Sequence, residues 1–207
     1  MPSTDENVVV HNIHKLVRKA RQLINAKQDG PNVRIIGRSG FQGLTAGFHL
    51  HYGLPRHLLG RSSQTRNLAG LITRACDYYI GVPSIVPEGD NDNLRRTLPY
   101  VDYGKPGGYR LDNRTFEYRM PGGINLRHPC LTRGLMALGA VVVEDLVSRI
   151  NIGTDFFSNL SGVASEEDIR ELYPNLPDLE TIYAIICNPN ISPARNYFQS
   201  IKEDVRK

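Results

Sequence analysis

The sequence of 207 residues has little cysteine and no long apolar run. Its three cysteines lie far apart and show no Cys-x-x-Cys spacing, so neither a zinc site nor a disulfide framework is indicated. They are most simply reduced, structural thiols in a cytosolic setting. The longest apolar run, LMALGAVVV, is too short to span a bilayer, and the start MPSTDENVVV does not resemble a signal peptide. We therefore expect no membrane partner.

Signatures of several common binding and catalytic classes are also missing. The glycines around residues 37–47 are not followed by Gly-Lys-Ser/Thr, so they do not form a phosphate loop. Phe41 stands where the second glycine of a G-x-S-x-G hydrolase elbow would be. The net charge is +4 and the pI about 9.0, but no DNA- or RNA-binding signature accompanies the charge. Nucleic acid is thus a poor candidate partner, whereas arginines also grip phosphate and carboxylate groups.

Two short stretches carry polar side chains at every second position. In RTFEYRMPGG (114–123), apolar residues alternate with Glu117 and Arg119, and in AGFHLHYG (46–53) they alternate with His49 and His51. Successive side chains of a strand point to opposite faces, so each stretch predicts a strand with one apolar and one polar face. The simplest alternatives are a surface ion pair for the Glu-x-Arg pair and ordinary hydrogen bonding for the histidines.

Taken together, the two stretches suggest phosphate chemistry. A histidine and a glutamate could hold one divalent cation, and the arginine could neutralise phosphate. The Gly- and Pro-rich stretch 86–110, predicted to be a long loop, adds further cationic side chains. These are Arg95, Arg96, Lys105 and Arg110. Such a collection suits nucleotide-dependent phosphoryl transfer, in which positioning and charge neutralisation supply most of the catalysis.

Helical periodicity surrounds these strands. Helices are predicted over residues 8–28 after a strand-like start, 64–83 with a stop at Gly81 and Pro83, 131–150, and 192–207. The apolar stretch 131–150 is expected to be largely buried, with Leu135, Leu138, Val142 and Leu146 packed. Strands with polar pairs and helices covering their other side indicate an α+β fold.

Four motifs resemble, in the same order, those of the phage amidoligase family, the glutamine-synthetase-like carboxylate–amine ligases of COOH-NH2 ligase type 2. They are the His-containing strand at 46–53, a helix ending in GVPS at 64–84, the loop YGKPGGYR at 103–110 and the EYR strand at 116–121. The resemblance covers about residues 33–150. It implies a glutamine-synthetase-like antiparallel sheet covered by helices. Residues 1–153 would form this domain, truncated at its N-terminus, and residues 154–207 a C-terminal helical extension packed on it.

The resemblance also implies a chemistry, because the family joins a carboxylate to an amine with ATP and Mg2+ through an acyl-phosphate. His49 and Glu117 would be metal ligands, with His51 in a supporting place. Arg119 would bind phosphate and stabilise the transition state, so Arg119 and Arg110 are the expected catalytic residues. Lys105, Arg110 and Arg119 would contact nucleotide or substrate carboxylate.

The chain departs from the family in its supply of carboxylates. Only 48 residues precede His49, and their carboxylates are Asp5, Glu6 and Asp29. The stretch DENVVVHN (5–12) resembles the tail of an acidic strand, with His11 in place of a glutamate. We therefore expect a site that is incomplete in this chain alone.

Three explanations for the incomplete site stay open. Another copy of the chain completes it, a companion chain supplies acidic strands, or the protein is a degenerate ligase that serves as a non-catalytic phage structural or virion-assembly protein. The expected location is the host cytoplasm or the virion, where other virion proteins would be its partners.

Overall fold

The computed structural model describes residues 5–26, 38–41, 44–60, 62–99, 101, 103–112, 114–152, 170 and 173–204. The helices are α1 (Glu6–Asn25), α2 (Ser63–Cys76), α3 (Val82–Ile85), α4 (Gly89–Asn93), α5 (Pro129–Ile152), α8 (Leu179–Ile186) and α9 (Ser192–Asp204). The strands are β1 (Gly40–Phe41), β2 (Leu44–Thr45), β3 (Leu50–Gly53), β4 (Tyr109–Leu111) and β5 (Thr115–Tyr118). Short 3₁₀ segments are η1 (Arg56–Leu58), η3 (Leu94–Thr97) and η4 (Gly123–Leu126), and η2 (Asp77–Gly81) is π-helical. The fold is α+β, as predicted.

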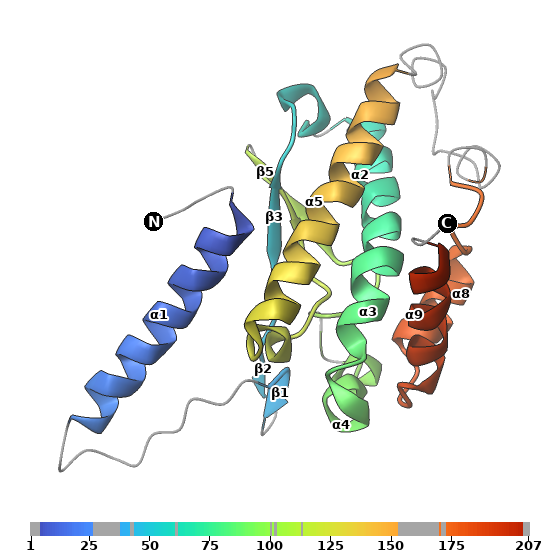
Figure 1. Ribbon diagram of the computed structural model, residues 1–207. Coiled ribbons are helices and arrows are strands. Elements are labelled where there is room, and N and C mark those ends of the chain that lie inside the picture. Colours follow the sequence, from blue (N-terminus) through green and yellow to red (C-terminus); the bar gives the residue numbers. More distant parts are fainter. Residues whose placement is uncertain are drawn as a thin grey trace.

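The central sheet is antiparallel, with strand order β3-β5-β4. Its apolar face carries Leu50, Phe116 and Tyr118, all of which are buried. Helices α5 and α2 pack against this face, while α8 and α9 lie beyond α3, away from the sheet (Figure 1). The opposite face carries the alternating polar residues, so the period-two pattern correctly predicted the two sides of the sheet. Its likeness to glutamine synthetase stays a prediction.

The helix predicted over 64–83 does not stop at Gly81 and Pro83. It continues from α2 through the π-helical η2 into α3. Pro83 lies at the start of α3, directly after the π-helical residues, so its missing N–H falls where the continuous helix changes its winding. Gly81 is buried against the sheet, and a Cβ there would lie 2.7 Å from the Tyr118 hydroxyl. The glycine and proline thus serve close packing and continuation rather than termination.

The strand-like start predicted for residues 5–12 is also wrong. Asp5 caps α1 by accepting hydrogen bonds from the backbone N–H groups of Asn7 and Val8, so helix begins at Glu6. The stretch is therefore not the tail of an acidic strand. Helix α1 contacts α5 and lies at the outside of the molecule (Figure 1). It leaves apolar side chains exposed, including Leu16 at 69% and Leu23 at 58%.

Buried residues of the sheet and of α2, α3, α5, α8 and α9 form one hydrophobic core, to which α1 contributes little. Leu135 and Leu146 of α5 are buried as predicted, but Leu138 and Val142 are only half-buried and Val141 is 63% exposed. One face of α5 is buried rather than most of the helix, because only one side meets the sheet and α2. Ile182 and Ile186 of α8 join the same core. Among the described residues, no helix has the length and apolarity needed to cross a membrane.

Candidate functional site

The polar face of the sheet brings together most of the predicted site residues. The strand register places His51, Glu117 and Arg110 in one row across β3, β5 and β4. Cross-strand neighbours in an antiparallel sheet share a face, so the three side chains project to the same side. His49 directly precedes β3, and its ring reaches Glu117 on that side. We predicted His49 and Glu117 on neighbouring antiparallel strands with their side chains on one face; the shared face is confirmed, although His49 lies one residue before β3.

The Glu117 carboxylate lies at the centre of this cluster. Oε1 is 2.9 Å from His49 Nδ1, 3.7 Å from Arg119 Nε and 4.0 Å from His51 Nε2, while Oε2 is 2.6 Å from Arg110 Nε. The Glu117 side chain is only 5% exposed, whereas Arg110 is 60% exposed. The carboxylate is thus covered by cationic and titratable side chains, which form the outer surface of the site. We call these five residues the Glu117 cluster.

His49 is held on three sides. Its ring stacks on Tyr103 at 5.7 Å between centroids, and a Cβ on Gly47 would collide with its Nε2. Glycine at position 47 therefore makes room for the imidazole. Burial lowers the pKa of His49; Glu117 opposes this effect and Arg119 reinforces it. This environment favours a neutral His49, whose Nδ1–H donates to the Glu117 carboxylate.

Tyr103 is a site residue that the sequence reasoning missed. The Arg119 guanidinium lies 4.1 Å from the centre of its ring, and the His49 ring is stacked on it. Such a contact orients the arginine without neutralising its charge. The available signal was an aromatic residue at the start of YGKPGGYR, within a loop already rich in cations.

The loop that carries Tyr103 is fixed from below by Asp77. One oxygen of this buried carboxylate accepts a hydrogen bond from the Gly107 backbone N–H at 2.6 Å, and the other accepts one from the Tyr118 hydroxyl at 2.8 Å. Burial raises the pKa of Asp77 to about 7, although both hydrogen bonds and the charge of Arg96 oppose the rise. Gly107 has φ of 74°, a conformation that favours glycine.

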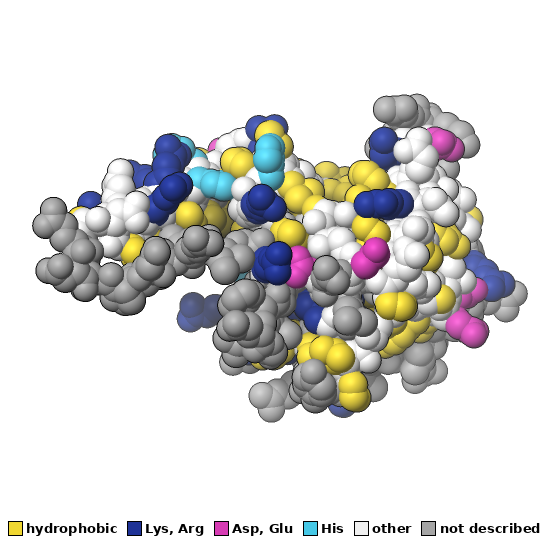
Figure 2. Space-filling model, turned by 90° about the horizontal axis from the view of Figure 1, so that it is seen from below, with side chains coloured by type: hydrophobic (Ala, Val, Ile, Leu, Met, Phe, Trp, Pro, Cys, Tyr) yellow, Lys and Arg dark blue, Asp and Glu magenta, His cyan; other side chains and the backbone are white. Residues whose placement is uncertain are grey.

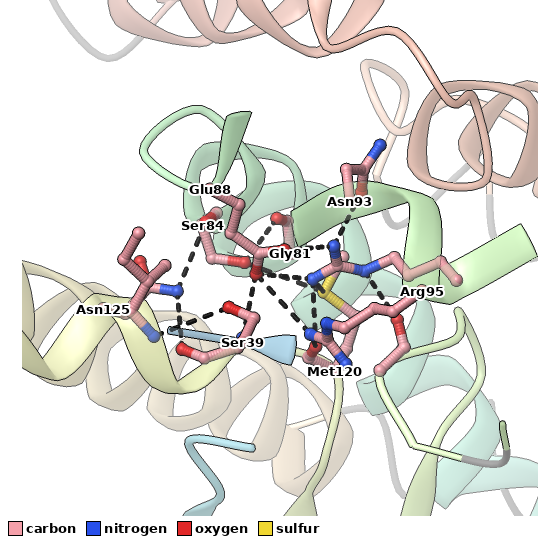
Figure 3. Close-up of polar contacts among 12 residues, drawn as sticks. Ser39, Gly81, Ser84, Glu88, Asn93, Arg95, Met120 and Asn125 are labelled. Carbon is pink, nitrogen blue, oxygen red and sulfur yellow. Dashed lines mark hydrogen bonds and ion pairs between the residues drawn. The ribbon is translucent and has the colours of Figure 1, made fainter. Parts of the chain in front are cut away.

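A buried polar network supports the same loop from the side of α4 (Figure 3). The Glu88 carboxylate pairs with Arg96 and also accepts from the Gly122 backbone N–H at 3.1 Å. Arg96 donates to the Gly104 carbonyl at 2.7 Å, and Arg95 donates to the Tyr103 carbonyl at 3.2 Å. Removing one partner of such a pair would leave a buried charge uncompensated.

This network corrects the expectation that Arg95 and Arg96 belong to a phosphate-binding collection. Both side chains are buried and engaged with Glu88 and with backbone carbonyls. The cause is that residues 86–110 are not one open loop: α4 and η3 form within them and turn the arginines inward. Arg95 and Arg96 support the site loop from inside the molecule.

Lys105 does not join the Glu117 cluster among the described residues. Its charge acts instead on Cys187. Burial raises the pKa of this thiol, and the charges of Arg96 and Lys105 offset part of the rise. Its expected contact with nucleotide remains a prediction.

The cluster as it stands fits an anion better than Mg2+. Its one carboxylate is close to Arg110 and His49, and although Glu117 Oε2 accepts no hydrogen bond within the described residues, the other candidate ligand atoms are nitrogens, whereas Mg2+ takes oxygen ligands. Within the part of the chain that the structure describes, no three His, Cys, Asp or Glu side chains form a group that could hold a metal ion. The metal-ligand roles of His49 and Glu117 therefore need oxygen donors from elsewhere.

Comparison with known proteins supports the family resemblance of the sequence motifs. The Phage phiEco32-like COOH.NH2 ligase-type 2 family matches residues 1–159. The chain belongs to this family. No curated protein and no solved structure matches it. The family description indicates carboxylate–amine ligase chemistry for the part of the chain that holds the Glu117 cluster.

Proposed function

We propose that this chain is a carboxylate–amine ligase subunit whose Glu117 cluster receives the phosphate groups of ATP. The observation that supports the proposal is one buried carboxylate with two guanidinium and two imidazole groups around it. Glu117 balances one of the two arginine charges, so the cluster keeps a net positive charge. ATP supplies the phosphoryl group that activates the carboxylate substrate.

Arg110 and Arg119 have different parts in this proposal. Arg110 is exposed and forms an ion pair with Glu117 through Nε, so we assign its other guanidinium N–H donors to an incoming phosphate. Arg119 is oriented by Tyr103 and supplies a fixed positive charge close to the same place. Donors that are held in place before the ligand arrives stabilise developing negative charge with little reorganisation.

We place the oxygen ligands for Mg2+ on a second chain, either another copy or a companion protein. A groove of about 910 Å³ between α1, β3 and α5 is lined by every residue from Phe48 to Pro55, including His49 and His51. Successive side chains of a strand point to opposite faces of the sheet. Consecutive residues can therefore line one groove only if the groove follows the edge of the strand. A segment of the second chain at this edge would bring its carboxylates beside the two histidines.

The first test is ATP binding by the purified chain without magnesium, measured by calorimetry. Saturable binding that weakens with added salt is expected, because the contacts are ionic and partly exposed. Glu117→Gln should strengthen this binding by about threefold or more, since it removes the charge that competes with phosphate for Arg110. Arg119→Gln should weaken it. Loss of binding in Glu117→Gln would contradict the proposed role of the arginines.

The second measurement is ATP consumption with magnesium and a panel of amino acids and amines. Negligible turnover is expected from the chain alone, and turnover should appear when the second chain is supplied. Robust turnover by the isolated chain, abolished by Glu117→Ala, would establish a self-sufficient enzyme. Absence of any ATP binding would favour the non-catalytic structural or virion-assembly role.

A further inference from the structure

Two adjoining grooves lie beside β4 and at the end of the sheet where β3 ends and β5 begins. One, of about 690 Å³, is lined by Arg66, by the four consecutive residues from Tyr109 to Asp112, and by Leu59 and Gly60. The other, of about 770 Å³, shares Leu59 and Gly60 and adds Leu54, Arg56 and Arg114. Four consecutive residues can line one groove only along a strand edge, so the first groove follows the outer edge of β4, which pairs with no further strand among the described residues.

Arginines from four separate elements border these grooves. Arg56 lies in η1, Arg66 in α2, Arg110 in β4 and Arg114 in the turn before β5. All four are exposed, and within the described residues no ion pair joins Arg56, Arg66 or Arg114 to a carboxylate. We call these residues and the two grooves the arginine channel.

The acidic residue that lines the channel does not neutralise it. Asp112 accepts hydrogen bonds from the backbone N–H groups of Arg114 and Thr115, at 2.7 and 2.6 Å, and another from the Thr115 hydroxyl. These bonds lower the pKa of Asp112 and bind its oxygens to the turn. Asp112 therefore stays ionised and offsets one positive charge, but the three other arginines leave the channel with a net positive charge, and Arg110 connects it to the Glu117 cluster.

The free edge of β4 indicates what kind of anion fits. An edge strand leaves backbone N–H and C=O groups unpaired, and an extended polypeptide can pair with them. Single-stranded nucleic acid instead needs aromatic platforms for its bases. Tyr109, the aromatic residue of the channel, is half-buried and stacks inward on Phe116 at 5.8 Å between centroids.

We infer that the arginine channel binds an acidic polypeptide segment and delivers one of its carboxylates to the Glu117 cluster. This inference rests on the proposed function and specifies the carboxylate substrate as part of a polypeptide rather than a free amino acid. The arginines hold neighbouring acidic side chains, and the edge of β4 holds the backbone extended.

The experiment measures binding of a fluorescent hexaglutamate peptide to the full chain by anisotropy, without ATP or magnesium. The triple variant Arg56→Gln, Arg66→Gln, Arg114→Gln should bind at least about tenfold more weakly, since three ionic contacts are lost. The matched control removes the same number of positive charges outside the channel, in the triple variant Arg127→Gln, Arg133→Gln, Arg195→Gln. This control should bind the peptide within about twofold of the native chain. A hexaglutamate with alternate backbone amides methylated should bind more weakly than the plain peptide.

Several outcomes would overturn the inference. These are equal losses in both triple variants, tighter binding of oligothymidine than of the peptide, displacement of the peptide by free glutamate at equal concentration, or no effect of amide methylation. Because the assay involves no turnover, channel binding without ligase activity would count against the proposed function alone. Ligase turnover on free amino acids without peptide binding would count against the channel alone.

Discussion

At the scale of single residues, Asp77 connects the helical layer to the site. Its carboxylate holds Gly107 and Tyr118 at once, and Gly107 belongs to the loop that brings Tyr103 over His49 and Arg119. A side chain that is buried beneath the sheet thus determines the position of a side chain on the sheet's outer face. The protonation state of Asp77 is accordingly coupled to the stability of the fold.

We predict that Asp77→Asn becomes more stable relative to the native chain as pH rises. The folded-state pKa of Asp77 is raised from 3.8 to about 7, so the folded chain binds more protons than the unfolded chain across that interval. The native chain therefore loses the stability gained from proton uptake as pH rises through about 7, whereas an amide, which resembles the protonated acid, does not titrate. Denaturant unfolding of both proteins between pH 4.5 and 8 measures the difference, and a pH-independent difference would refute the coupling.

The site residues differ in how well sequence could predict them. His49, His51, Glu117, Arg110 and Arg119 meet because strand alternation fixes which side each faces. Arg95 and Arg96 lie in the short η3 segment, whose formation within a Gly- and Pro-rich stretch no sequence period announced, and their contacts with Glu88 turn them inward. Tyr103 was missed for the same reason, since its position depends on the Asp77 and Arg95 contacts of its loop.

At the scale of elements, the two central glycines of α5 have opposite surroundings. A Cβ on Gly139 would collide with the Tyr52 hydroxyl and lie 2.9 Å from Tyr52 Cζ, whereas a Cβ on Gly134 would meet nothing within 4 Å. Tyr52 cannot easily move aside, because its ring is stacked near Phe116. One glycine is thus required for helix–sheet packing and the other is not.

We predict opposite effects for the two alanine substitutions in α5. Gly134→Ala should stabilise the protein by about 0.5–1 kcal/mol, the usual gain from replacing glycine within a helix. Gly139→Ala should destabilise it by about 1–3 kcal/mol through overpacking. Denaturant titration of both variants measures the contrast, and each serves as the control for the other. Equal effects would show that α5 does not pack closely on Tyr52.

The presence of helices was easier to predict than the residues at which they begin and end. The 3.6-residue period correctly indicated α2, α5 and α9, because burial of one face dominates long helices. Gly81 and Pro83 wrongly predicted the end of a helix. Gly81 packs closely against Tyr118 and Pro83 lies at the start of α3, and this packing outweighs the low helix propensity of both residues. At residues 5–12, the three consecutive valines suggested a strand, but the cap at Asp5 begins a helix.

At the scale of the whole molecule, the C-terminal helices share the core of the family-matched region. Ile182 and Ile186 of α8 are fully buried, although they lie beyond the matched residues 1–159. Helices α8 and α9 both contact α3, which leads back through η2 to the loop anchor at Asp77. The stability of the site-bearing sheet is therefore expected to depend on residues outside the family match.

We predict that Ile186→Ala destabilises the entire fold by about 2–5 kcal/mol, the usual cost of a large-to-small change at a buried site. Unfolding followed by far-ultraviolet circular dichroism should remain a single transition with a lower midpoint. Leu179→Ala, in the same helix but 49% exposed, is the matched control and should change stability by less than about 0.5 kcal/mol. A separate early transition for Ile186→Ala would show that α8 unfolds independently of the sheet.

The π-helical turn at η2 has a consequence for how related chains are aligned. Its hydrogen bonds run from residue i to i+5, so the turn holds one residue more than an α-helical turn would. A relative lacking one residue between positions 77 and 81 can run as continuous α-helix and still present the α3 positions to the same neighbours. A one-residue gap in a sequence alignment at this place would therefore mean that the π-helical turn is replaced by α-helix. The core residues before and after the gap would still correspond to each other.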